Sequence, residues 1–244
     1  MQSTERKRTE INEDGNLTGV QTAPKLAEEL IDGAAQAAPS SNGGPEAANE
    51  ERADYISEGF PIGSMPGLSA AQESEASDKT VSMAVFLDKL GERLAFERMG
   101  TRLYDGLINK VETLDPNSTA PSLDELMEIR DEEHRHFLLL NEAVTELGGD
   151  PTVMSPCADV ASVASQGIMQ VIMDPRTTVT QCLDAILTAE LTDNAGWEML
   201  CDLADDLGHP DLADKFREAL EIEETHLINV KTWLSGKVMA QAAP

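Results

Sequence analysis

The chain has 244 residues, enough for one large domain with a tail, and its net charge is −27 at pH 7. Such a negative charge disfavours nucleic acid and anionic membranes as partners, because both are themselves polyanions. Three cysteines with no CxxC pair do not form the framework of a disulfide-stapled secreted domain.

The first residues of the chain, Met1 to Asp14, are polar and charged and lack the apolar core of a secretory signal. No run in the sequence approaches the roughly 20 apolar residues that a membrane-spanning helix needs. We therefore expect a cytoplasmic protein that binds neither a membrane nor nucleic acid.

Residues 1–80 are expected to form a low-complexity, largely disordered acidic arm. Within it, Ala34 to Asn49 is rich in Ala, Ser, Gly, Pro and Asn and shows no period. Such a stretch buries too little apolar surface to offset its ordering entropy. Two short motifs, Asn16 to Val20 and Gly59 to Gly63, are either linker punctuation or parts of an arm that docks on the rest of the chain or on another subunit.

The remainder of the chain has apolar residues every three or four positions, the pattern of amphipathic helices. A first helix is predicted near residues 81–111 and a second over 122–147. Ser122 followed by Glu125 forms a capping box, which marks the start of the second helix. The pair Gly148-Gly149 supplies the left-handed residue that ends this helix.

A long connection follows, and it is predicted to contain a short helix over residues 158–173. Two further long helices are predicted over residues 177–207 and 211–234, and residues 237–244 are expected to form a short flexible tail. The short connections make two antiparallel hairpins, whereas the long one can cross the bundle from end to end. The sequence therefore predicts an all-α four-helix bundle over residues 81–236.

Each half of this predicted bundle carries the same pattern of acidic and histidine residues. The second and fourth helices each contain a Glu-x-x-His pair, whose members are neighbours on one helix face. The preceding helix in each half has a further glutamate in its apolar stripe. The six residues are Glu97, Glu133, His136, Glu190, Glu223 and His226.

The four glutamates predict a metal centre because of what their burial costs. A lone glutamate in a helical stripe can be a misjudged surface residue, but four isolated buried carboxylates would each cost several kcal/mol. Two divalent cations balance four carboxylates when both imidazoles are neutral, and this donor set suits iron or manganese. We predict two metal ions, bridged by Glu133 and Glu223, with Glu97 and Glu190 as terminal ligands.

Several segments resemble a ferritin-like domain of the rubrerythrin branch, over Val81 to Leu234 but not in the arm. They are Leu94 to Arg98 with Tyr104, Glu132 to Phe137, Leu147 to Pro151, Ala189 to Leu191, and Glu223 to His226. The resemblance implies a di-iron centre that reacts with peroxide or dioxygen. Rubrerythrins proper append a rubredoxin with two CxxC pairs, which this sequence lacks. The electron donor would then be a separate protein, or Fe(II) itself would be the reductant.

Other residues lie close to the predicted ligands. Tyr104 is two turns after Glu97, and it either fills the core, hydrogen-bonds a ligand carboxylate, or acts as a catalytic donor of an electron or a proton. Asp193 follows Glu190 by three residues and is a candidate for an extra ligand or a partner of a histidine. His134 is expected to face solvent.

The expected function is that of a non-haem di-iron protein of the ferroxidase or peroxidase type. The alternatives are a dimanganese catalase, and a metal-sequestering, cargo or docking protein that acts through the arm. The expected partners are a second copy of the chain, with a dimer favoured, a separate electron-donor protein and a docking partner of the arm. Gly91, Gly100 and Gly106 on the first helix would allow close approach of another helix, which is a hint of pairing.

Overall fold

The computed structural model describes residues 24–36, 44–58, 78–116, 118 and 120–243. The chain divides into two compact units, Met1–Phe60 and Pro61–Pro244. Throughout these described ranges the regular structure is helical. None of the described helices is both long and apolar enough to cross a membrane.

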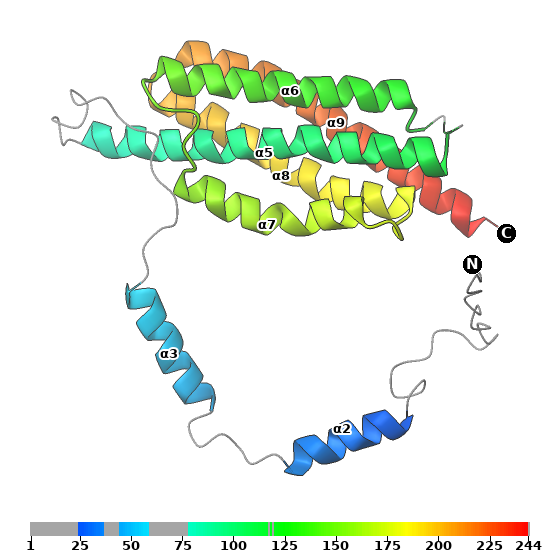
Figure 1. Ribbon diagram of the computed structural model, residues 1–244. Helices are drawn as coiled ribbons and strands as arrows, with labels where there is room; N and C mark the ends of the chain where they lie inside the picture. Colours follow the sequence, from blue (N-terminus) through cyan, green and yellow to red (C-terminus); the bar gives the residue numbers. More distant parts are fainter. Residues whose placement is uncertain (1–23, 37–43, 59–77, 117, 119, 244) are drawn as a thin grey trace, which may run out of the picture. The chain divides into compact units, whose positions relative to one another are not determined.

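The described part of the first unit has two helices, α2 (Pro24–Gln36) and α3 (Pro45–Glu58) (Figure 1). Each begins at a proline, whose fixed φ suits the first turn of a helix. The sequence analysis expected a mostly irregular arm and did not predict these two helices. The motifs at residues 16–20 and 59–63 lie outside the described residues.

The second unit is a four-helix bundle with one additional helix. α5 and α6 form one antiparallel hairpin, α8 and α9 form the other, and α7 lies in the long connection between them (Figure 1). α7 packs along α5 and α8, so the connection crosses the bundle from one end to the other. The predicted all-α bundle of two hairpins and a crossover is therefore confirmed. The helices are α5 (Asp78–Leu114), α6 (Leu123–Glu146), α7 (Pro156–Met173), α8 (Val179–Asp206) and α9 (Pro210–Ala242).

The helix boundaries follow from local capping signals. Ser122 and Glu125 form the predicted capping box, because Ser122 N donates to Glu125 Oε2 at 2.8 Å and Glu125 N donates to Ser122 Oγ at 3.3 Å. Thr178 and Gln181 repeat this arrangement at the start of α8. Gly148 has a φ of 81°, which ends α6 in the left-handed conformation as predicted.

α9 is longer than the sequence analysis expected. The prediction ended this helix at Leu234 and placed a flexible tail after it, whereas α9 continues to Ala242. Contacts with two other parts of the bundle account for the extension. Lys237 Nζ lies 2.9 Å from Asp115 Oδ2, and Gln241 Nε2 donates to Thr180 Oγ1 at 2.8 Å.

The glycines of α5 allow close packing within the chain itself. A Cβ atom on Gly91 would lie 2.6 Å from Ser155 Oγ, and one on Gly106 would lie 2.6 Å from Ile172 Cγ2. Gly91 therefore allows Ser155, just before α7, to pack closely on α5, and Gly106 does the same for Ile172 of α7. They give no support to the idea that this face of α5 packs against a partner helix.

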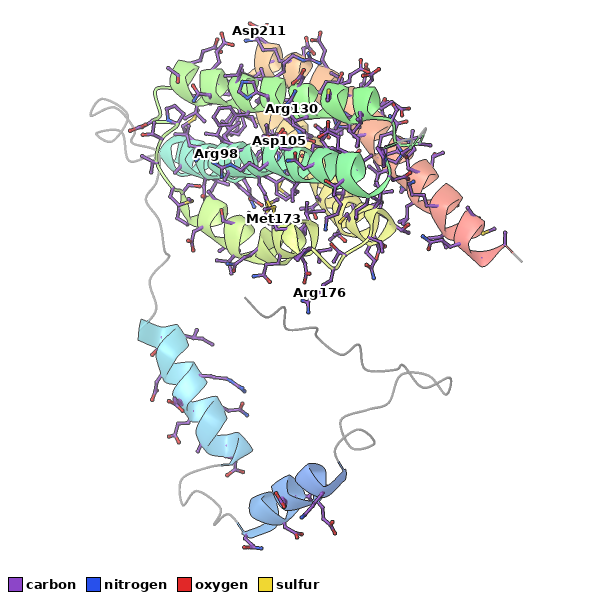
Figure 2. All side chains as sticks on the ribbon, turned by 45° about the vertical axis from the view of Figure 1, so that its right-hand side comes forward. Arg98, Asp105, Arg130, Met173, Arg176 and Asp211 are labelled. Carbon is purple, nitrogen blue, oxygen red and sulfur yellow. The ribbon has the colours of Figure 1, made fainter. Side chains whose placement is uncertain are left out.

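Two apolar clusters fill the bundle, one toward each end. The first cluster includes Leu103 of α5 and Leu183 of α8, and the second cluster includes Leu90 of α5 and Phe216 of α9. On α6, α8 and α9, the buried polar residues fall between the positions that belong to the two clusters. On α5, Arg93 and Glu97 lie where Leu94 of the second cluster and Phe96 of the first come close together in the sequence. At the surface, Arg130 of α6 pairs with Asp105 of α5 at 3.1 Å (Figure 2). The bundle thus places one polar layer between two dry layers.

Candidate metal centre

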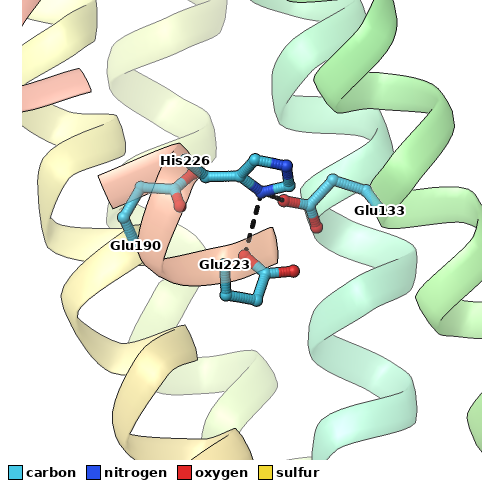
Figure 3. A group of neighbouring side chains, drawn as sticks. All are labelled: Glu133, Glu190, Glu223 and His226. Carbon is cyan, nitrogen blue, oxygen red and sulfur yellow. Dashed lines mark hydrogen bonds and ion pairs between the residues drawn. The ribbon is translucent and has the colours of Figure 1, made fainter. Parts of the chain in front are cut away.

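The six residues predicted as ligands come together in this polar layer. All are buried, and the most exposed of them, His136, is 4% exposed. Ligand atoms of one group lie within 4.8 Å of one another, and the group contains Glu133, Glu190, Glu223 and His226 (Figure 3). A second such group contains Glu97, His136 and Glu223. Glu223 belongs to both groups, so they share one centre.

The two histidines point the same nitrogen at the carboxylates. His136 Nδ1 lies 2.5 Å from Glu223 Oε1, and His226 Nδ1 lies 3.0 Å from Glu223 Oε2 (Figure 3 shows the second contact). His226 Nδ1 is also 3.7 Å from Glu133 Oε1. One carboxylate therefore lies between both imidazoles, as a bridging ligand would.

The two hairpins of the bundle also repeat the same hydrogen bond to a candidate ligand. Tyr104 follows Glu97 by two turns of α5, and its hydroxyl donates to Glu190 Oε1 on α8. Trp197 follows Glu190 by the same interval on α8, and its Nε1 donates to Glu97 Oε1 at 3.0 Å. Each hairpin thus fixes the glutamate of the other. A hydrogen bond to a ligand carboxylate was one of the roles predicted for Tyr104, whereas no such role was predicted for Trp197.

α5 leaves room for a ligand through a glycine. A Cβ atom on Gly100 would lie 2.0 Å from Glu133 Oε2. The carboxylate of α6 therefore occupies the space where any other residue of α5 would place a side chain. Gly100 therefore allows the carboxylate of Glu133, and not a partner helix, to lie close to α5.

A fifth acid and a buried base belong to the same layer, and the sequence analysis did not predict the base. Asp193 is 2% exposed and forms a group with Glu97, Glu133 and Glu223. Arg93 is 4% exposed, with Nη1 at 3.1 Å from Asp193 Oδ1 and Nε at 3.0 Å from Glu97 Oε1. Asp193 therefore has an ion pair with Arg93 and also lies among the candidate ligand atoms, so its role as an extra ligand stays a prediction.

Residues 117–237 match the family model of the ferritin-like domain. The bundle has a ferritin-like fold. The matched range includes every predicted ligand except Glu97, which lies on the preceding helix α5. No curated protein and no solved structure matches the chain.

The donor set of this ferritin-like bundle fits a pair of metal ions. Glu97, Glu133 and Glu190 each have one buried oxygen without a hydrogen-bond partner within the described part of the chain. Leaving such an atom unsatisfied costs about 1–3 kcal/mol, and more when the group is charged. The five buried carboxylates and one guanidinium sum to −4, which two divalent cations would balance. The cluster therefore has both the free lone pairs and the charge that two cations require.

The proton affinities in the cluster show the same excess of negative charge. Burial, with the charge of Glu223 adding to it, raises the pKa of Glu133 to about 8. Burial likewise raises the pKa of Glu97 and of Glu190 well above the usual range. Burial alone would raise the pKa of Glu223 too, but hydrogen bonds with His136 and His226 outweigh it and hold that pKa at about 2. Without cations, protons would neutralise part of the cluster.

The stability of the metal-free protein is expected to fall as the pH rises from about 5 to about 8. The folded state keeps a proton on Glu133 that the unfolded state releases near pH 4.5, so this stabilisation disappears as the pH approaches 8. Glu223 does not offset the loss, because its contribution is lost only as the pH falls below 4.5 towards 2. Thermal unfolding in a chelator at both pH values measures the effect. A melting temperature that rises between these two pH values would contradict the raised pKa of Glu133.

A further carboxylate holds His226 from outside the cluster. Glu132 Oε2 lies 2.8 Å from His226 Nε2, the nitrogen that faces away from Glu223. Burial alone would lower the pKa of His226, but hydrogen bonds with Glu132, Glu133 and Glu223 raise it well above the usual range. A carboxylate that accepts the Nε2 proton leaves Nδ1 free for a metal and fixes the ring.

Glu132→Ala is expected to weaken metal binding by about 10- to 100-fold, because His226 loses the group that orients its ring. The matched control is Glu128→Ala, which removes an exposed glutamate from the same helix. Titration with a competing metal-sensitive dye measures both affinities. Equal affinities in the two variants would show that Glu132 does not support a ligand.

Proposed function

We propose that this ferritin-like domain binds two iron ions through Glu97, Glu133, His136, Glu190, Glu223 and His226 and acts as a non-haem di-iron oxidoreductase. The observation that carries the proposal is the buried charge of −4 in a layer closed by apolar clusters on both sides. Structural ion pairing does not explain it, because Arg93 is the one lysine or arginine buried among the described residues. Two divalent ions account for the whole imbalance.

Glu223 and Glu133 would be the ligands shared by both ions, and Glu97 and Glu190 would each hold one ion. Glu223 belongs to all three groups of neighbouring ligand atoms, which supports its shared role, whereas Glu133 and Glu97 each belong to two. The role of Glu133 rests on the Glu-x-x-His pattern that it repeats. Glu97 and Glu190 lie on different hairpins, and each accepts a hydrogen bond from Trp197 or Tyr104 of the other hairpin.

Iron, when bound, supplies two electrons to a peroxide or to dioxygen, with Fe(II) as the substrate itself in a ferroxidase. The chain contributes geometry, a dry surrounding and a proton. Burial and the charge of Glu190 raise the pKa of Tyr104 well above its usual value, so its hydroxyl remains protonated at neutral pH. Tyr104 is therefore proposed as the group that holds a proton beside the centre.

Tyr104→Phe is expected to retain both metal ions but to slow their oxidation by about 100-fold or more, the lower end of the range for a lost proton donor. Trp197→Phe is the matched control, because it removes the symmetry-related hydrogen bond to a glutamate. Stopped-flow absorbance after mixing with peroxide measures both rates. If the two variants slow equally, Tyr104 only positions Glu190 and is not a proton donor.

The experiment that tests the function is metal analysis of anaerobically purified protein, followed by absorption spectroscopy after peroxide and, separately, dioxygen. The proposal expects iron and an oxidised spectrum with at least one oxidant. Manganese in place of iron would favour a dimanganese catalase. Bound iron that neither oxidant changes would favour metal sequestration. Deletion of residues 1–80 tests a cargo or docking role, because assembly would then fail while metal loading and turnover persist.

A further inference from the structure

A cavity of about 360 Å³ opens to the surface between α5, α7 and α8. Its volume lies within the range of pockets that bind small organic molecules. Most of its wall is apolar or small, and it includes Phe96, Val160, Ala161, Ile168, Ala195 and Met199. The proposed function uses none of these residues.

The wall also has polar residues, namely Lys89, which pairs with Glu92, and Ser165, Thr188 and Thr192. The buried charged group in the wall is Arg93, the base that pairs with Glu97 and Asp193. Arg93 is 4% exposed, and its Nη2 has no hydrogen-bond acceptor within the described part of the chain. The ring of Phe96, 3.9 Å from the guanidinium carbon, covers one of its faces. An almost fully buried donor without a partner is costly, and an acceptor in the cavity would satisfy it.

Gly196 of α8 makes room for the guanidinium of Arg93. It lines the cavity, and a Cβ atom there would lie 2.1 Å from Arg93 Nη1. Any other residue at this position would push the guanidinium away from its present place. The position of Arg93 in the cavity wall therefore depends on the absence of a side chain at this point of α8.

We propose that this cavity binds a medium-chain aliphatic molecule that ends in one uncharged oxygen acceptor, such as a hydroxyl, hydroperoxyl or carbonyl group. The apolar wall would cover the chain, and Arg93 Nη2 would donate to the oxygen. A carboxylate is disfavoured because Glu97 and Asp193 already face the same guanidinium, and the whole protein is strongly acidic. The site goes beyond the proposed function, since it requires no metal ion.

Calorimetric titration of the full chain with decanol, and separately with decanoate, tests the proposal. Decanol is expected to bind saturably and more tightly than decanoate. Ala161→Leu, which fills the cavity from α7, and Gly196→Ala, which displaces Arg93, are each expected to weaken decanol binding by about tenfold or more. Val163→Leu is the control, because Val163 lies on the same helix, is 67% exposed and does not line the cavity.

The metal content of each variant is measured alongside, so that a failure here is distinguished from a failure of the di-iron proposal. Wild-type metal content in Ala161→Leu, with decanol binding weakened in both cavity variants and kept in Val163→Leu, supports the site. Absence of saturable decanol binding to the wild type overturns the proposal. Tighter binding of decanoate, or unchanged decanol binding by Ala161→Leu, overturns it equally.

Discussion

Replacing Glu223 with alanine is expected to abolish the binding of both metal ions together. Its two oxygens lie against the two histidines, at 2.5 Å from His136 Nδ1 and 3.0 Å from His226 Nδ1. It is also the residue common to all groups of neighbouring ligand atoms. Loss of a glutamate that binds one metal ion would leave the site of the other ion complete. Loss of Glu223 removes a ligand from the sites of both ions.

The matched control is Glu224→Ala, which removes the neighbouring, exposed glutamate of the same helix. This variant is expected to bind two metal ions per chain, like the wild type. Anaerobic titration with Fe(II), followed by separation of free metal, counts the ions in each protein. Stoichiometric binding of two ions by Glu223→Ala would show that the ligand assignment is wrong.

Arg93→Met is expected to lower the free energy of unfolding of the metal-loaded protein by about 3–5 kcal/mol. The guanidinium contacts Glu97 and Asp193, all three groups being at most 4% exposed. Its removal leaves one negative charge in the dry interior that the two cations do not balance. Methionine retains much of the side-chain volume, so the change tests charge rather than packing.

Urea unfolding at a fixed free-metal concentration measures this loss. Arg217→Met provides the control, because Arg217 is 45% exposed and pairs with Asp205 and Asp214 at the surface. Exposed pairs of this kind contribute roughly 0–1 kcal/mol. If both variants lose stability to the same small extent, Arg93 does not balance a buried charge.

The sequence predicted the bundle and the placement of the six candidate ligands because their signals are local and repeated. A Glu-x-x-His pair on one helix face can be recognised without knowing how the helices pack. Its recurrence in the second half indicated that the ligands of both hairpins lie at the same depth in the bundle. Ser122 and Gly148 marked helix ends through capping alone. The end of α9 was wrong because its last turns depend on contacts of Lys237 and Gln241 with distant residues.

Arg93 and Trp197 show what local patterns miss. Arg93 lies one turn before Glu97, and nothing in the sequence around it distinguishes it from an arginine at the surface. Asp193 follows Glu190 by three residues and so shares its buried face. A buried aspartate needs a positive charge beside it, and a search for that charge could have identified Arg93. Trp197 could have been found by applying to α8 the interval that separates Tyr104 from Glu97 on α5. Glu132 faces His226 only because α6 and α9 are neighbours in space.

The central claim is that one buried layer holds two metal ions, and the metal stoichiometry of the wild-type chain tests it most directly. Protein that has been stripped with a chelator is titrated anaerobically with Fe(II), and bound metal is counted by elemental analysis against protein concentration. The account predicts saturation at two ions per chain, because the layer carries a charge of −4 and shares Glu223 between two ligand groups. Saturation at one ion, or no specific binding, would contradict it.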